Sequence, residues 1–346
     1  MRLPDLNNLK DHLLFFAPGL DWVQVEVSSF CNASCLYCPH TVFQSAWINR
    51  HLSLATFQKL LPALSRAKLV YLQGWGEPFL NPDFLDMLKL AKNAGCRVGT
   101  STNGVLLDEK MIKKLIELGL DVIAFSLAGI DENNDIVRKG TRIKTVIEAI
   151  KSINREKRKA GNESPSINIA YMLLRSRIKD LPKMPLQFKE LGIDQIVIST
   201  LDFIPDKELA KESLHPRNAI EYEQLRSLLD RTVETGKSCG LDIHYNIYNP
   251  SGRREMCTEN VQKAVYISAD GDISPCVFTN LPISGSAQQL DKIYPPYHRL
   301  TFGNIEDHGL AYIWRQKDYA KFRKCFDSDK LAPSCQKCPK LYMASR

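Results

Sequence analysis

The 346-residue sequence lacks a long hydrophobic run. The longest apolar stretch near the N-terminus, 13–17, is followed by Pro18, Gly19 and Asp21. It is too short for the apolar part of a signal peptide or for a membrane span. Internal repeats and low-complexity segments are also missing. We therefore expect a cytoplasmic protein that does not interact with a membrane.

The chain also lacks a strong excess of one charge. Lys and Arg total 46 and Asp and Glu total 39, which gives a net charge of +7. The basic residues are spread through segments such as 151–159, where Glu156 interrupts the run and no aromatic residue is interleaved. This pattern is typical of solvated helix faces and disfavours a nucleic-acid partner.

Short β-rich runs alternate with amphipathic stretches from residue 22 onward, which predicts an α/β fold with a parallel sheet. Helices are expected at 53–67, where Ser53 is the N-cap, and at 108–118, and Pro82 is expected at the first position of another helix. The six predicted strands are 22–27, 69–73, 97–100, 121–126, 167–173 and 195–200.

The alternation of predicted helices and strands ends at residue 249. There the sequence Asn-Pro-Ser-Gly follows a predicted helix at 217–238 and a short predicted strand at 242–245. We therefore expect two domains, 1–248 and 249–346. In the second domain, an Asp-Gly pair predicts the turn of a hairpin over 265–276. A helix is expected over 308–325.

Cysteine is abundant for a cytoplasmic chain, with ten residues in total. A reducing compartment disfavours disulfides, so clustered cysteines are better candidates for metal ligands. Cys31, Cys35 and Cys38 follow the first strand with CxxxCxxC spacing. Three thiolates leave one iron of a cubane cluster without a protein ligand, which is a site for a cofactor or substrate. The alternative is a zinc site with His40 as the fourth ligand.

This spacing at the end of the first strand resembles the radical S-adenosylmethionine (SAM) family. The resemblance implies a partial (βα)₆ barrel with its site at the carboxyl ends of the strands. It also implies a [4Fe–4S] cluster whose open iron binds the amino and carboxylate groups of SAM. In that family, an electron from the reduced cluster cleaves SAM, and the 5′-deoxyadenosyl radical abstracts a hydrogen atom from the substrate.

Four further segments resemble the SAM pocket of this family. Gly74, Gly76 and Glu77 stand in a Gly-Trp-Gly-Glu-Pro sequence that resembles the GGEP motif with the first glycine displaced. Thr102 and Asn103 match a stretch that meets the ribose in the family.

Ser126 follows the fourth predicted strand, and with Arg138 it resembles the pair that holds the carboxylate of SAM. A guanidinium suits this role because it pairs with a carboxylate in bidentate fashion. Lys139 and Arg142 are alternatives to Arg138. Tyr37 matches the aromatic position beside the adenine, or else it packs in the core.

A second cysteine set resembles the auxiliary-cluster domains known as SPASM and twitch. The spacing from Cys257 through Gly271 to Cys276 fits the first half of such a domain, and Cys335 and Cys338 form its CxxC pair. With five cysteines in this region, one auxiliary [4Fe–4S] cluster is expected, bound by Cys257, Cys276, Cys335 and Cys338. The rival is a structural zinc site. Cys325 stays unassigned.

Together these resemblances imply a radical SAM oxidoreductase or maturase that acts on a peptide or small-molecule precursor. The auxiliary cluster would accept an electron, so that the net reaction is an oxidation. A flavodoxin or ferredoxin is the expected electron donor, and a separate leader-binding protein is a possible partner. An RNA-modifying enzyme and a non-catalytic iron–sulfur carrier or sensor are the alternatives. No carboxylate stands out as a catalytic acid or base.

Overall fold

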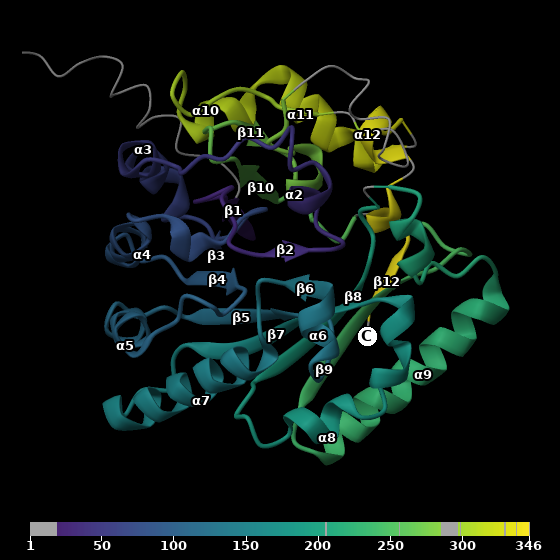
Figure 1. Cartoon of the computed structure of the whole chain (residues 1–346). Coiled ribbons are helices and arrows are strands. Elements are labelled where there is room, and N and C mark those ends of the chain that lie inside the picture. Colours follow the sequence, from purple (N-terminus) through teal and green to yellow (C-terminus); the bar gives the residue numbers. More distant parts are fainter. Residues whose placement is uncertain are drawn as a thin grey trace, which may run out of the picture.

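A ten-stranded sheet runs through the computed structural model, in the order β11-β10-β1-β3-β4-β5-β7-β8-β9-β12 (Figure 1). A separate two-stranded ladder joins β2 and β6. The described residues are 19–204, 206–255, 257–284, 297, 299–328, 330–336 and 338–345.

The six predicted strands are confirmed, and they lie side by side in chain order with parallel pairing. Parallel neighbours bring the carboxyl ends of all six strands to one edge, where the loops that follow them meet. The strands are β1 (Trp22–Val25), β3 (Leu69–Leu72), β4 (Val98–Thr102), β5 (Val122–Leu127), β7 (Ser166–Leu173) and β8 (Gln195–Thr200).

Four more strands extend this sheet at both edges. β9 (Asp242–Tyr248) pairs in parallel with β8, and β10 (Ala264–Ile267) pairs in parallel with β1. β11 (Ile273–Ser274) and β12 (Met343–Ser345) are the antiparallel edge strands. The chain after residue 249 therefore supplies both edges of the open sheet. The domain division between residues 248 and 249 stays a prediction.

Helices cover the outer face of the sheet (Figure 1). In β7, alternate residues such as Ile167 and Tyr171 are buried, and they share a hydrophobic cluster with Ile150 and Phe188 from the helices. This alternation is the period of two that a strand imposes on its side chains. The covering helices are α3 (Leu54–Leu64), α4 (Phe84–Asn93), α5 (Glu109–Glu117), α7 (Ile143–Ala160), α8 (Met184–Phe188) and α9 (Ala219–Ser238).

Shorter elements complete the described part of the chain, in which no helix combines the length and apolar character needed to cross a membrane. They are α2 (Pro39–Val42), β2 (Ser34–Cys35), η1 (Pro78–Leu80), α6 (Asn133–Val137), β6 (Arg138–Lys139), η2 (Arg175–Asp180), η3 (Leu209–Glu212), η4 (Val277–Thr279), α10 (Leu310–Arg315), α11 (Lys317–Lys324), η6 (Cys325–Asp327), α12 (Pro333–Gln336) and η7 (Pro339–Leu341).

Helix starts agree with the sequence at Ser53, whose side chain accepts a hydrogen bond from the backbone N–H of Thr56 at 3.0 Å. This is the usual N-cap contact. The prediction for Pro82 was wrong, because α4 begins at Phe84 with Asp83 as its N-cap. The side chain of Asn81 accepts the Asp83 N–H at 2.8 Å, so Pro82 lies in the turn before the helix.

The hairpin over 265–276 is confirmed, with β10 and β11 antiparallel and Gly271 donating its N–H to the carbonyl of Ser268.

The single helix predicted over 308–325 was wrong. The chain forms α10 and α11 instead, and Gln316 between them is extended with φ −52° and ψ 143°. Five residues span about 500° along a continuous helix, so Trp314 and Tyr319 would face directions about 140° apart. The break lets their rings meet edge to face, with centroids 5.0 Å apart.

The Tyr319 ring is a stability test for this region. It is fully buried and stacks on Phe302 with ring centroids 4.2 Å apart. We expect Tyr319→Ala to lower the free energy of unfolding by about 3–5 kcal/mol, because it leaves a cavity where an aromatic ring was packed. Chemical denaturation under anaerobic conditions measures the change. The exposed Tyr312 provides the control, and equal losses for Tyr312→Ala and Tyr319→Ala would contradict the packing argument.

Candidate functional site

The loop after β1 carries the first cysteine set. A two-residue antiparallel ladder pairs Cys35 with Arg138 and Ser34 with Lys139. The backbone N–H of Leu36 also donates to the carbonyl of Val137 at 2.9 Å. This ladder between β2 and β6 holds Arg138 beside the cysteines, although about one hundred residues separate them in the sequence.

The three thiols lie close enough to influence one another. Burial raises the pKa of Cys31 to about 11 and that of Cys38 to about 12, and the neighbouring cysteines add to both shifts. Thiols in such surroundings need a cationic group before they become thiolates, and a bound iron cluster supplies that charge. Cys31, Cys35 and Cys38 therefore fit a cluster. His40 packs edge-on against Trp47.

Arg138 is buried, with 7% of its surface exposed, whereas Lys139 and Arg142 are exposed. Its Nη1 donates to the hydroxyl of Tyr37, and the guanidinium lies 5.9 Å from the centroid of the same ring. Its Nε has no hydrogen-bond partner among the residues that the structure describes. A buried guanidinium with an unused N–H is suited to bind a carboxylate.

Ser126 lies near the end of β5, where it pairs with Ala170 of β7. Among the described residues, no hydrogen bond joins it to Arg138. The two members of this predicted pair are therefore not hydrogen-bonded to each other within the described part of the chain.

Glu77 connects the loops after β3 and β4. Its carboxylate accepts hydrogen bonds from Thr102 Oγ1 and from the backbone N–H of Asn103, both at 2.8 Å. Burial raises the pKa of Glu77 to about 7. Asn103 Nδ2 in turn donates to Asn32 Oδ1 in the cysteine loop at 2.7 Å. These three predicted SAM-pocket residues thus bind one another and fix the loops around the first cysteine set.

Two glycines let these loops approach each other. A Cβ at Gly76 would lie 2.4 Å from the carbonyl oxygen of Phe30, and one at Gly74 would lie 2.3 Å from Cγ of Glu26. Both distances are shorter than a side chain tolerates, so glycine is required by close packing at both positions. The N–H of Glu77 donates to the Phe30 carbonyl at 2.8 Å, which holds this loop against the cysteine loop.

Glu26 is a residue of this site that the sequence reasoning missed. It is completely buried directly after β1, and burial raises its pKa to about 7. One carboxylate oxygen accepts the N–H of Trp75 at 2.8 Å, and the other accepts the N–H of Ala269 at 3.2 Å. An acidic residue within the apolar run from Val23 to Val27 was the available signal.

Trp75 connects the two cysteine sets. Its backbone lies in the loop that also carries Glu77, while its indole N–H donates to the carbonyls of Val277 and Asn280, each at 3.2 Å. Val277 directly follows Cys276. The indole ring also contacts Phe278, with centroids 5.9 Å apart. The loop beside the first cysteine set is therefore bound directly to the loop that follows Cys276.

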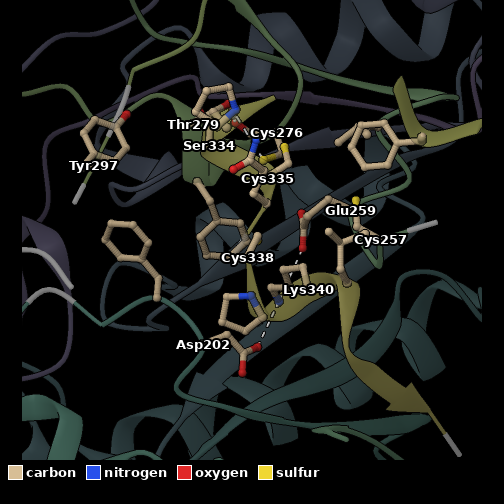
Figure 2. Close-up of a pocket in the computed structure, with 18 of the residues that line it drawn as sticks. Asp202, Cys257, Glu259, Cys276, Thr279, Tyr297, Ser334, Cys335, Cys338 and Lys340 are labelled. Carbon is tan, nitrogen blue, oxygen red and sulfur yellow. Dashed lines mark hydrogen bonds and ion pairs between the residues drawn. The ribbon is translucent and has the colours of Figure 1, made fainter. Parts of the chain in front are cut away.

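The second cysteine set lines a cavity of about 270 Å³, which Figure 2 shows with Cys257, Cys276, Cys335 and Cys338 around it. Burial is the main cause that raises all four pKa values, to about 12 for Cys335 and about 11 for Cys338. Neighbouring thiols also raise the pKa of Cys276, Cys335 and Cys338. The structure thus brings together these four cysteines from segments far apart in the sequence.

The four thiols match the ligand count of a cubane cluster, and also that of a tetrahedral zinc ion, because both take four sulfur ligands. Four buried thiols around a cavity fit a group that has its own volume, such as an iron–sulfur cubane.

Cys325 lies just outside this set. It follows α11, and its thiol donates to the carbonyl of Lys321 at 3.2 Å. It is not among the residues that line the cavity, although its charge acts on Cys335.

A buried group of charges lies at the same cavity, and the sequence reasoning did not find it. Lys340 Nζ lies 3.1 Å from Asp202 Oδ2 and 3.4 Å from Glu259 Oε1. Although burial opposes ionisation, the charge of Lys340 holds the pKa of Asp202 below its usual value. The same ammonium lies 4.9 Å from the centroid of Phe278.

The site agrees with comparisons to known proteins. The sequence model of the radical SAM superfamily matches residues 25–175. The model described as SPASM, an iron–sulfur cluster-binding domain, matches residues 257–339. These two matches contain both cysteine sets.

Two curated relatives match over nearly the whole chain. The tungsten-containing aldehyde ferredoxin oxidoreductase cofactor-modifying protein of Pyrococcus furiosus is 28% identical, over 92% of this chain and 87% of its own length. The PqqA peptide cyclase of Xanthomonas campestris is 23% identical, over 92% of this chain and 79% of its own.

The fold matches that of Streptococcus suis SuiB bound to S-adenosylmethionine, with a TM-score of 0.66 and 15% identity, over 92% of this chain and 70% of the other.

The predicted fold, cofactors and enzyme class are thereby confirmed. A radical SAM domain implies SAM and a [4Fe–4S] cluster, and a SPASM domain implies auxiliary iron–sulfur binding. The chain therefore carries a radical SAM domain over residues 25–175 and a C-terminal SPASM domain over residues 257–339, which are the domains of an enzyme.

Proposed function

We propose that this enzyme removes a hydrogen atom from a peptide or small-molecule precursor and completes the reaction as a net oxidation. The SAM-binding cluster is assigned to Cys31, Cys35 and Cys38. The auxiliary [4Fe–4S] cluster is assigned to Cys257, Cys276, Cys335 and Cys338. The observation that carries the proposal is the direct link through Trp75 between the loops that hold these two cysteine sets.

The first site is arranged to bind SAM by its methionine end. The unpartnered Nε of Arg138 provides an N–H for the carboxylate, and Tyr37 fixes the guanidinium from the other side. Ser126 at the end of β5 supplies a hydroxyl at the same edge. Glu77, Thr102 and Asn103 hold the loops in place, and Gly74 and Gly76 allow the loop after β3 to pack closely against Glu26 and the backbone of Phe30. When bound, the cluster and SAM supply a carbon radical that takes hydrogen from the substrate.

The second site is suited to electron transfer. Four thiols complete the coordination of a cubane cluster, so no iron is left open for substrate. A substrate that has lost a hydrogen atom reaches the oxidised product by releasing one more electron and one proton. A cluster held by these thiols would accept the electron and would pass it on to a flavodoxin or ferredoxin before the next turnover. A flavodoxin or ferredoxin would also supply the electron that starts SAM cleavage.

The substrate class follows the relatives. One is named for modifying a cofactor and the other for cyclising a peptide. We propose a precursor of one of these two kinds, with a separate leader-binding protein if it is a peptide. A reducing compartment such as the cytoplasm suits ten cysteines that are all free.

The metal content tests the two ligand sets. Anaerobically reconstituted protein is expected to hold about eight irons per chain, as two cubane clusters. Cys276→Ala combined with Cys338→Ala should lower this to about four, because the auxiliary cluster loses half of its ligands. Iron and sulfide analysis measures both values. Cys239→Ala is the matched control. One zinc beside four irons in the unaltered protein would contradict the auxiliary cluster.

The SAM chemistry provides a second test. Reduced protein with SAM should form 5′-deoxyadenosine and methionine, and Cys38→Ala should abolish this because the cluster loses one of its three ligands. The Cys276→Ala, Cys338→Ala protein should still cleave SAM. Chromatography of the products measures the outcome. Equal 5′-deoxyadenosine formation by Cys38→Ala and unaltered protein would refute the assignment of the first site.

Arg138 provides a third test. Arg138→Met should weaken SAM binding by about 10- to 100-fold, since a charge-assisted hydrogen bond contributes about 1.5–3 kcal/mol. Equilibrium binding of SAM to the reconstituted, oxidised protein measures the change. Arg142→Met removes an exposed arginine nearby and should leave the affinity unaltered. If Arg142→Met instead caused the loss, Arg138 would not be the carboxylate partner.

A further inference from the structure

Three charged side chains meet at the cavity of the second cysteine set. Lys340 lies between Asp202 and Glu259, at 3.1 Å and 3.4 Å, and Figure 2 shows the three side chains converging below the thiols. The side chains of Lys340, Asp202 and Glu259 are only 15%, 5% and 20% exposed. Charges buried to this degree are costly unless they are paired, and their fields are poorly screened by water.

The backbone ties this charged group to the cysteines. Glu259 comes two residues after Cys257, and Lys340 comes two residues after Cys338. The backbone N–H groups of Glu259 and Lys340 lie near the thiols of Cys257 and Cys338 and act to lower the pKa of each thiol. The N–H of Thr258 also donates to the carbonyl of Lys340 at 3.2 Å. The two cysteine segments therefore hold Lys340 and Glu259 at fixed positions.

Asp202 comes from the barrel and anchors the ammonium. It lies two residues after β8, and its other oxygen accepts the Thr200 hydroxyl at 2.7 Å. His215 Nε2 lies 3.4 Å from the same oxygen. Asp202 is thus held by its own strand end and by the chain before α9, and it keeps Lys340 directed towards the barrel side of the cavity.

Lys340 and Glu259 act on the thiols in opposite senses. The Glu259 carboxylate disfavours the thiolates of Cys257, Cys276 and Cys338, whereas the Lys340 ammonium favours those of Cys257 and Cys338. The charges of Lys340 and Glu259 therefore lie close enough to the cysteines to change the pKa values of their thiols.

We propose that Lys340 and Glu259 set the reduction potential of the auxiliary cluster, and that Lys340 keeps it high enough for the cluster to accept an electron. Both are positioning residues that act through charge. The inference rests on the proposed function, which assigns the cluster to Cys257, Cys276, Cys335 and Cys338.

The direction of each effect follows from the charge change on reduction. The cluster gains one electron, so a nearby cation stabilises the reduced form and raises the potential. A nearby carboxylate destabilises the reduced form and lowers the potential. Lys340 therefore makes the cluster a better electron acceptor, and Glu259 makes it a poorer one.

A redox titration followed by electron paramagnetic resonance tests this inference. The background is the full-length protein with Cys31→Ala, Cys35→Ala and Cys38→Ala, in which the auxiliary cluster is observed alone. Added to it, Lys340→Met should shift the midpoint potential downwards, and Glu259→Gln should shift it upwards. The pair of changes together should return it towards the starting value. Glu306→Gln, which removes a surface carboxylate paired with Lys59, should cause no shift.

Each possible shift of the midpoint potential supports or contradicts the inference. Opposite shifts for Lys340→Met and Glu259→Gln support the inference, whereas no shift, or shifts in the same direction, overturn it. If Lys340→Met fails to bind the cluster, Glu259→Gln decides alone, since only an upward shift agrees with the inference. A background protein without a reducible cluster overturns the proposed auxiliary ligand set itself. Failure of the inference and failure of the proposed function are therefore distinguishable.

Discussion

The carboxylate of Glu26 connects the barrel to the C-terminal segment of the protein. One oxygen binds the backbone of Trp75, in the loop beside the first cysteine set, and the other binds Ala269, in the turn of the C-terminal hairpin. The carboxyl group of Glu26 is fully buried, and burial raises its pKa. Its hydrogen bonds are stronger than they would be in water, because the dielectric constant of the protein interior is low. Because β10 pairs directly with β1, the same contact sits where the barrel and the C-terminal segment share one sheet.

Burial dominates the chemistry of both cysteine sets. It disfavours thiolates at each set, and the compensating positive charges come from different places: Arg138 at the first and Lys340 at the second. Arg138 is held by Tyr37 and has an N–H without a partner among the described residues, whereas Lys340 is paired with two carboxylates. The first charge is therefore available to a ligand, and the second acts only through its field.

The sequence predicted the six barrel strands, the hairpin after β10 and the N-cap at Ser53, because strand periodicity, turn residues and capping act over a few neighbours. It failed where distant packing decides. The helix over 308–325 is broken so that Trp314 meets Tyr319, and Pro82 lies in a turn made by its neighbour Asn81, whose side-chain amide also donates to the distant carbonyl of Leu52. The strands β10, β11 and β12 were not assigned to the barrel sheet, since pairing between distant segments leaves no local pattern.

What the sequence determined by itself is the chemistry: two groups of cysteines with cluster spacing, and the family to which they belong, because ligand spacing is a property of short segments. The tertiary structure alone decided how the groups are joined. Glu26, Asp202 and Lys340 lie outside the motifs, Trp75 stands inside one without a predicted role, and the roles of all four depend on partners far away in the chain. A buried charge becomes functional only through what it contacts, and those contacts exist only in the folded chain.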